Sequence, residues 1–472
     1  MEESKLLLRE SEIELGISLE RPFLLEEVRS EIGRRLDPSS IPLRFAVTQS
    51  TPNSLRCSVS VMEGVPRELG TSVETIFRFS KRQFERTGRF NVVLNIPTGI
   101  GAEIGGHAGD AGSVAHLLSQ TCDTLILHPN VVNASDINEM PSNSLYVEGS
   151  VLSRLLMGTI GLATTRQNRV LVVIDDHDDE LFANAAVNAV SAARSSYGFS
   201  CQKVVKLRPP IKMWTEYTSV GVAAGKTTGL GRLFAVLEEH WGKYDAVALS
   251  SVIRVPHSFH QGYFDAMGEM VNPWGGVEAM VTHAVSSIYN VQSAHSPMFE
   301  SQEIANLDPG VVDVRMAAEA VSVTFLPSVL KGLHRSPRIL ASESGNWGGD
   351  VISAVDVSCL VIPDGCLGLP TLAAVEQGIP TIAVRENRNL MKNDLSKLAW
   401  RDGQFFRVNN YWEAAGVLCA VRAGISPESV RRPMGPTQTE NQTFRGRDDK
   451  DRSSGESERS ATLSDKQLSR TA

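Results

Sequence analysis

Short, continuously apolar runs alternate with longer helical patterns along most of this chain, and this alternation restricts the fold more than any other feature. Residues 91–96, 124–127 and 170–174 have the length and composition of buried strands. Helical patterns of ten or more residues follow, as over 111–122 and 181–197. Strands and helices in this order form βαβ units around a parallel sheet. We therefore predict an α/β protein with Rossmann-like, doubly wound units.

Changes in sequence character divide the chain into four predicted segments. Residues 1–90 form a small α+β section, and residues 91–215 form a first α/β unit. A second α/β unit follows over 216–429. Residues 430–472 contain almost no aliphatic side chains, so this segment cannot bury enough apolar surface to order itself. We predict that it is a disordered tail.

Four local predictions are specific enough to compare with the structure. Alternating apolar and polar residues over Leu43–Thr48 and Leu55–Met62 predict a β-hairpin. Helical patterns cover Val73–Arg86, Val151–Gly161 and Val311–Ala320.

The charge and the cysteines exclude several classes of protein. The 472 residues include 46 Lys and Arg against 54 Asp and Glu, a net charge of −8, so a sequence-independent nucleic-acid binder is not expected. The first residues lack the pattern of a targeting segment, and no apolar run is long enough to span a membrane. The six cysteines form no C-x-x-C pair. These features favour a reduced, cytoplasmic protein, and a homo-oligomer stays open.

A glycine-rich segment, Ile96–Asp110, lies between a predicted strand and a predicted helix, where parallel sheets bind ligands. Glycines there let backbone N–H groups approach an anion. The alternative is that the glycines only permit tight packing of helix on strand. The predicted anion-binding residues are Thr98, Gly99, Gly101 and Gly105, and the predicted acid–base catalysts are Glu103, His107 and Asp110.

Two familiar nucleotide motifs are disfavoured by the residues at their key positions. The third glycine of a dinucleotide fingerprint would stand at Ile104, and the next strand ends at His128 instead of an acid. The first glycine of a P-loop that ends at Lys226 would stand at Val220.

A second polar loop, His128–Pro141, follows the next strand and is predicted at the same sheet edge. Asn130, Asn133 and Asp136 are candidates to orient a ligand. Asn and Asp are also common in turns for local backbone reasons, so a purely structural role stays open.

Acidic and histidine residues offer a metal site as a further possibility. Asp175, Asp176 and His177 follow a buried strand, where oxygen ligands suit Mg²⁺ or Mn²⁺. The same acids would cap the helix that follows. Histidines between His257 and His295 could hold zinc, but nothing in the sequence fixes their geometry. The metal and the cofactor are left open.

A later segment repeats the first strand–turn pattern. Ile362-Pro363-Asp364-Gly365 echoes Ile96-Pro97-Thr98-Gly99, and both of the strands that follow end in Asn-bearing loops. We predict two analogous βαβ halves whose turns oppose each other across one cleft. Asp364 and Gly365 would then face the ligand, and Arg385 and Arg388 would neutralise it.

Three stretches, Ile96–Gly158, Asn272–Met280 and Pro363–Asn389, resemble an uncharacterised family of bacterial and plastid proteins that carries a domain-of-unknown-function label. The resemblance covers about residues 40–425 and implies an α/β protein, but it brings no activity or catalytic residues. A weaker likeness connects four residues with the nucleotide-sugar half of two-domain glycosyltransferases and sugar epimerases: Gly365, Glu376, Gly378 and Pro380.

The leading hypothesis is a cytoplasmic enzyme that binds a small anionic metabolite, phosphorylated or nucleotide-linked. Nucleotide-sugar transfer or epimerisation at Gly365–Arg385 is one alternative. The other is a non-catalytic ligand sensor or assembly subunit that uses the tail for contacts.

Overall fold

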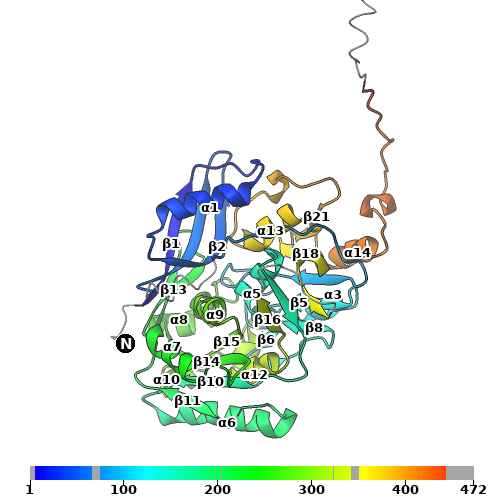
Figure 1. Ribbon diagram of the computed structural model, residues 1–472. Helices are drawn as coiled ribbons and strands as arrows, with labels where there is room; N and C mark the ends of the chain where they lie inside the picture. Colours follow the sequence, from blue (N-terminus) through cyan, green and yellow to red (C-terminus); the bar gives the residue numbers. More distant parts are fainter. Residues whose placement is uncertain (1–5, 66–74, 202, 323, 342–349, 443–472) are drawn as a thin grey trace, which may run out of the picture. The chain divides into compact units, whose positions relative to one another are not determined.

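A six-stranded sheet, parallel throughout, positions most of the loops discussed above (Figure 1). The structure is a computed structural model that describes residues 6–65, 75–201, 203–322, 324–341 and 350–442. The chain divides after Ile425 into two units. In order across the sheet the strands are β21 (Phe405–Val408), β20 (Thr381–Val384), β18 (Val357–Pro363), β4 (Asn91–Leu94), β5 (Thr124–Leu127) and β8 (Ser144–Tyr146).

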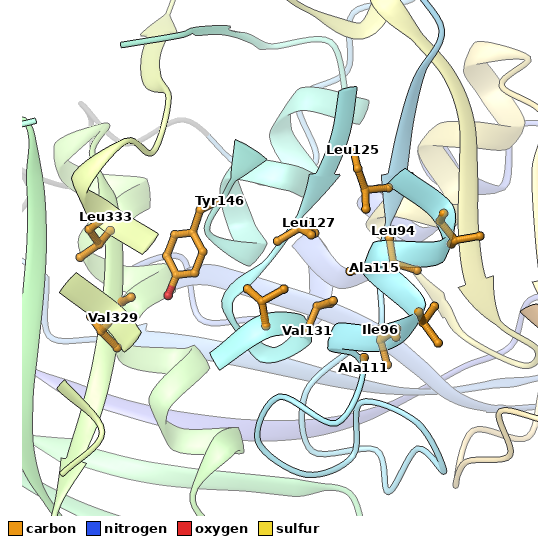
Figure 2. Close-up of a cluster of buried hydrophobic side chains, with 14 of the residues drawn as sticks. Leu94, Ile96, Ala111, Ala115, Leu125, Leu127, Val131, Tyr146, Val329 and Leu333 are labelled. Carbon is orange, nitrogen blue, oxygen red and sulfur yellow. The ribbon is translucent and has the colours of Figure 1, made fainter. Parts of the chain in front are cut away.

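Helices cover both faces of this sheet because its strands are apolar on both sides. Val92 and Leu94 of β4 join the core under α3 (Gly112–Ser119) and α14 (Tyr411–Arg422). Val93, between them, joins the core under α5 (Gly149–Leu156) and α13 (Leu369–Gln377). Figure 2 shows Leu94 and Leu125 near Ala115, with Tyr146 beside Val329 and Leu333.

A ten-stranded mixed sheet makes up the other large layer. Its parallel part is β11 (Val204–Leu207), β10 (Val170–Asp175), β14 (Ala246–Arg254) and β15 (Gln292–Met298). β14 also pairs in parallel with β12 (Lys212–Tyr217). From β12 the sheet continues antiparallel through β13 (Ala223–Thr228), β1 (Leu7–Leu15), β3 (Leu55–Glu63), β2 (Ile41–Ser50) and β19 (Leu367–Gly368).

Helices also lie on both faces of the parallel part. Apolar residues of α6 (Glu180–Tyr197) and α12 (Leu326–His334) share one core with Val172. Those of α7 (Leu230–Glu239) and α9 (Gly275–Tyr289) share another with Val173.

The remaining elements are short or peripheral. They are α1 (Leu24–Arg35), α4 (Pro129–Val132), β6 (Asn133–Ala134), β7 (Ile137–Asn138), β9 (Ile160–Ala163), α8 (His257–Asp265), α10 (Gln302–Ala305), α11 (Ala317–Ala320), β16 (Arg338–Ala341), β17 (Val351–Ile352), and the 3-10 turns η1 (Ala354–Asp356), η2 (Leu395–Lys397) and η3 (Pro427–Val430).

The prediction of an α/β protein with a parallel sheet and the β2–β3 hairpin is confirmed. Each large sheet takes strands from both predicted α/β units, 91–215 and 216–429. The two analogous βαβ halves lie side by side in one sheet, since β4 and β18 are hydrogen-bonded neighbours, and the cleft between their turns stays a prediction. Both strands are buried along their whole length, so each needs a partner on either side.

The helix predicted over Val73–Arg86 is wrong for residues 75–86, which carry no helix; residues 73 and 74 lie outside the described residues. Backbone groups of this segment make long-range hydrogen bonds in place of helical ones. Ser80 N donates to Met157 O, and Arg86 N donates to Val355 O. The Arg82 side chain donates to carbonyls of Ala354, Val357, Gln377 and Gly378.

Two other predicted helices are shorter than expected. The helix predicted over Val151–Gly161 ends at Leu156, because Gly158 turns the chain with φ +76° into β9. Of Val311–Ala320 only Ala317–Ala320 is helical. Val311 is 98% exposed and Val314 is 86% exposed, so these two side chains do not contribute to a buried helix face.

Part of the predicted tail lies within the described residues. Residues 431–442 are exposed and carry no helix or strand, whereas 443–472 lie outside the described residues. Among the helices that the structure describes, none combines the length and the apolar character needed to cross a bilayer.

Candidate functional site

Three adjoining cavities lie at the carboxyl edge of the six-stranded sheet, where its loops meet the ten-stranded sheet. The polar chamber, of about 130 Å³, is lined by loops after β4, β5 and β8 and by α9 and β15. The apolar chamber, of about 230 Å³, adjoins it, and both are lined by Ala108, Asn133, Asn272 and Glu278. The Arg44 chamber, of about 110 Å³, adjoins the polar chamber on the other side.

A buried carboxylate–imidazole pair joins α5 to α9 at the wall of the polar chamber. Glu148 Oε1 lies against His283 Nδ1, with the Glu148 side chain 2% exposed and that of His283 12% exposed. Thr282 Oγ1 donates to the same carboxylate oxygen at 3.3 Å. His283 also lines the Arg44 chamber. Because the carboxylate lies against Nδ1, Nε2 is the ring nitrogen that remains for a ligand.

Glu148 is held in place by the start of α5. Its other oxygen, Oε2, accepts from Ser150 N at 2.9 Å and Val151 N at 3.3 Å, and it also accepts from the Ser150 hydroxyl. Burial alone would raise the pKa of Glu148, but His283 and these donors outweigh burial and lower it. The residue is therefore a carboxylate that fixes the orientation of the His283 ring.

A second carboxylate–imidazole pair faces the same chamber. His295 Nδ1 lies 2.9 Å from Glu278 Oε1, and His295 Nε2 lies 2.6 Å from Ser251 Oγ. These contacts match a Ser–His–acid triad in connectivity. However, Ser251 is 2% exposed on β14 and contacts Met213 Sδ at 3.1 Å, whereas Glu278 lines the cavity. The carboxylate, and not the serine, is the end that a ligand can reach.

Helix α9, which carries Glu278 and His283, is fixed by the segment that precedes it. Asn272 Oδ1 accepts from Trp274 N at 3.0 Å and Gly275 N at 3.2 Å. A Cβ on Gly276 would lie 2.4 Å from the carbonyl of Ala223, so only glycine allows this close approach to β13. The Asn-Pro-Trp-Gly-Gly stretch thereby sets the position of the helix.

A third histidine, His128, forms part of the wall between the polar chamber and the Arg44 chamber. Its Nε2 accepts from Ile96 N at 3.2 Å. Burial lowers the pKa of His128 to about 4, so the ring is neutral at pH 7.

Four predicted ligand residues line the polar chamber: Thr98, Gly99, Asn130 and Asn133. Asn130 Nδ2 donates to Gly105 O at 2.6 Å, and Asn133 Nδ2 donates to Tyr146 Oη at 2.8 Å. Their amides therefore also hold the two loops together.

The predicted catalysts Glu103, His107 and Asp110 lie in the glycine-rich loop but are not among the residues that line the three chambers. Glu103 pairs with Arg315 at 3.0 Å and with Arg388 at 2.9 Å. Arg388, predicted to neutralise a ligand, is thus paired within the protein.

His107 and Asp110 belong to a hydrogen-bonded network under the loop. His107 Nδ1 lies 2.6 Å from Tyr263 Oη, and Asp110 Oδ1 accepts from Gly105 N at 2.8 Å. Glu319 Oε1 accepts from Ala108 N at 2.6 Å. Burial lowers the pKa of His107 to about 4 and raises that of Asp110 to about 7. Burial likewise raises the pKa of Glu319 to about 7.

The other predicted ligand residues hold turns at the same edge. Gly101 has φ +62° and Gly105 φ +85°, and a Cβ on Gly105 would meet Ile96 at 2.7 Å. Asp364 pairs with Arg407 at 3.1 Å, and a Cβ on Gly365 would meet Met391 O at 2.7 Å.

Arg385 and Asp136 lie outside the chamber walls. Arg385 is exposed and donates to Asn409 Oδ1 at 3.4 Å, and Asp136 accepts from Ser322 Oγ at 2.5 Å. The turns near residues 100, 365 and 387 do meet, because Leu390 N donates to Ile100 O and Asn389 Nδ2 to Asp364 O.

The metal candidates after β10 are engaged with the protein. Asp175 Oδ1 accepts from Ile211 N at 3.1 Å, and burial raises the pKa of Asp175 to about 8. Asp176 pairs with Arg208 at 2.6 Å, and His177 Nε2 lies 2.9 Å from Phe299 O. In the part of the chain that the structure describes, no three His, Cys, Asp or Glu side chains group as metal ligands would.

The four residues that resemble the nucleotide-sugar half of glycosyltransferases and epimerases lie at two opposite edges of the six-stranded sheet. Gly365 follows β18 at the carboxyl edge. Glu376 lies in the last turn of α13, and Gly378 and Pro380 lie between α13 and β20, at the opposite edge.

Sequence reasoning did not single out Glu148, and it considered His283 and His295 only as metal ligands. A signal for Glu148 exists: Val147-Glu148-Gly149 joins a strand to a helix, as the other loops at this edge do. Its pairing with His283, 135 positions away, has no local signal.

Comparison with known proteins identifies a family. The sequence profile of the DUF3326 family, proteins of unknown function, matches residues 91–431. An uncharacterized lipoprotein from Synechococcus sp. is 29% identical over 344 residues, which are 72% of this chain and 92% of that protein. No solved structure matches the chain. The cytoplasmic location stays a prediction. The resemblance to an uncharacterised family is confirmed, and the chain belongs to the DUF3326 family of proteins of unknown function.

Proposed function

We propose that the protein is an enzyme that performs acid–base chemistry on a small metabolite in the polar chamber. The observation that carries this proposal is the His283 ring, held at Nδ1 by the buried Glu148 carboxylate and lining the cavity. An imidazole fixed in this way accepts and returns a proton at its other nitrogen. Glu278, held by His295, is the second acid–base group.

The topology supports a ligand at this place. β4 and β18 are neighbours, and the chain runs from β4 to β5 and β8 in one direction but from β18 to β20 and β21 in the other. We propose that the sheet is a doubly wound, Rossmann-like unit with a switch point between β4 and β18. Ligands of such sheets bind outside the carboxyl ends of the strands at the switch point. Thr98 and Cys366, from the loops after these two strands, both line the Arg44 chamber.

The predicted anionic group of the metabolite has support in the Arg44 chamber. Arg44 is a cation whose side chain is 16% exposed there, although Glu10 lies 3.4 Å away. Thr98 adds a hydroxyl group, and His283 lines this chamber too. An anion held here, phosphate or carboxylate, would place the rest of the ligand beside the acid–base groups.

The test is turnover in a metabolite extract, followed by mass spectrometry. The wild-type chain is expected to deplete one compound, and His283→Ala to slow that depletion at least about a hundredfold while the chain stays folded. His116→Ala, at an exposed histidine on α3, is the matched control and keeps the wild-type rate. Wild-type turnover by His283→Ala contradicts the proposal.

A second experiment, read together with the turnover assay, separates the enzyme from the non-catalytic sensor and from a nucleotide-sugar enzyme. A thermal-shift panel of nucleotides, sugar nucleotides, acyl-CoA and divalent metals reports which class binds, because a ligand that binds only the folded state raises the Tm. A compound that raises the Tm but is never consumed favours the non-catalytic sensor. A nucleotide sugar as the consumed compound favours transfer or epimerisation.

A further inference from the structure

The apolar chamber, next to the acid–base groups, has a wall rich in aromatic rings. Phe264, Trp274, Phe299 and Phe325 line it, together with the imidazole of His260. The rings come from α8, from the segment before α9, from the end of β15 and from the start of α12. They also pack on one another, with 5.7 Å between the centres of His260 and Trp274 and 6.1 Å between those of Phe299 and Phe325. Rings from four separate segments thus surround one space of about 230 Å³.

Three carboxyl groups belong to this wall, and burial raises the pKa of one of them, Glu319, to about 7. Glu278, Glu300 and Glu319 line the chamber, and among the described residues that line it there is no Lys or Arg. Glu278 is 23% exposed at the point where the apolar and polar chambers meet. Arg254 approaches Glu300 only to 4.0 Å and is not part of the wall. Burial lowers the pKa of His260, so this ring adds no positive charge at pH 7.

Two buried polar atoms in the same wall have no hydrogen-bond partner among the described residues. They are Ser135 Oγ and His260 Nε2. An unpartnered polar atom in a buried position is unfavourable by about 1–3 kcal/mol unless a ligand or water satisfies it. A wall of well-packed apolar core would not contain such atoms together with three carboxyl groups.

We propose that the apolar chamber binds the cationic end of the metabolite, an alkylated amine or quaternary ammonium group. Aromatic faces attract a cation through their quadrupoles, and the carboxylates add a charge of opposite sign. A phosphate or carboxylate would meet carboxyl groups and no Lys or Arg here, and a neutral alkyl group would gain no electrostatic attraction from them. Glu278, Asn133 and Asn272 line both chambers, so the cationic end of the metabolite would lie beside the part that reacts in the polar chamber. This last step rests on the proposed function.

Three molecules of almost the same shape test the charge preference in the full chain. The probes are choline, 3,3-dimethylbutan-1-ol and 3,3-dimethylbutanoate, which are cationic, neutral and anionic. Isothermal titration calorimetry is expected to show that choline binds at least about tenfold more tightly than the other two. Equal binding of the neutral probe, tighter binding of the anion, or no binding of choline would overturn the proposal.

Two variants locate the binding. Glu278→Gln keeps the size of the side chain but removes its charge, and it is expected to weaken choline binding about tenfold. Trp274→Leu is expected to weaken it by a similar factor, and Glu300→Gln provides a second charge variant at a half-exposed position if Trp274→Leu does not fold. Unchanged choline affinity in both charge variants contradicts the proposal.

The His283→Ala protein separates this proposal from the proposed function. Choline binding should persist in it, because His283 is not part of the apolar wall. If choline binds selectively but no metabolite is ever turned over, the cation chamber stands and the acid–base proposal fails. If a metabolite is turned over but choline does not bind, the reverse holds.

Discussion

The glycine-rich loop Ile96–Asp110 and the contact between α5 and α9 both bring acids and histidines to one edge of the sheet, but they use them differently. In the loop, Glu103 pairs with two arginines and Asp110 holds the backbone of Gly105. At the helix contact, Glu148 holds His283, and the histidine lines a cavity. The polar groups of the loop stabilise the loop, whereas those of the helix contact leave one ring nitrogen for a ligand.

The difference follows from the number of backbone groups that each region must satisfy. A loop without regular hydrogen bonds needs side chains as partners, and its acids and amides supply them. A helix satisfies its own backbone except in its first and last turns. Side chains on α9 are therefore available for other contacts. We expect catalytic groups on the helix side of this edge, with the loop as the support.

The largest effect is expected from Glu148→Ala, which removes both the side-chain cap of α5 and the partner of His283. The free energy of unfolding should fall by about 3–4 kcal/mol, because buried donors lose their acceptor. Urea unfolding measures it. The matched variant Asn410→Ala, at the cap of α14, should cost only about 1 kcal/mol. Similar losses in the two variants would mean that Glu148 is an ordinary cap.

Gly105→Ala tests whether glycine in the loop serves packing or a ligand. With φ +85° and Ile96 at 2.7 Å from an added Cβ, the variant should lose about 2–3 kcal/mol of stability without any ligand present. Gly198→Ala, with φ +71° but no atom within 4 Å, should lose about 1 kcal/mol. If Gly105→Ala kept full stability but lost ligand binding, the glycine-rich loop would be the anion-binding site.

The pH dependence of stability tests the network under the loop. Since burial raises the pKa of Asp110 to about 7, the folded state holds this proton more tightly than the unfolded state. The resulting stabilisation is present below about pH 4, where both states are protonated, and is lost as the pH rises through 7. Compared with Asp110→Asn, the wild type should therefore lose about 2 kcal/mol between pH 5 and pH 8. Parallel unfolding curves for the two proteins would show that Asp110 titrates normally.

The smallest effect is expected from Arg388→Ala. Its pair with Glu103 is exposed to solvent, with 79% of the Arg388 side chain accessible, so stability should change by less than about 0.5 kcal/mol. Ligand affinity and turnover should also be retained. A loss of ligand affinity greater than about tenfold would make Arg388 a ligand residue, as the sequence predicts, and would weaken the contrast between the two regions.

The sequence predicts the strands and their loops better than it predicts their partners. Leu-rich β5 has its predicted bounds because a short apolar run between turn residues is a local signal. The neighbours β4 and β18 lie more than 260 positions apart, and no local pattern specifies that pairing. Local loop patterns likewise predict Thr98 and Asn130, which line the polar chamber. The pair of Glu148 with His283 has no local pattern and is visible only in the structure.

The most direct measurement is a crystal structure of the chain with a compound that raises its Tm. The account predicts electron density for that compound in the polar chamber, with one of its polar atoms within about 3.2 Å of His283 Nε2 and Glu278 close by. A compound seated instead on the outer side of the glycine-rich loop, against Arg385 and Arg388, would contradict it.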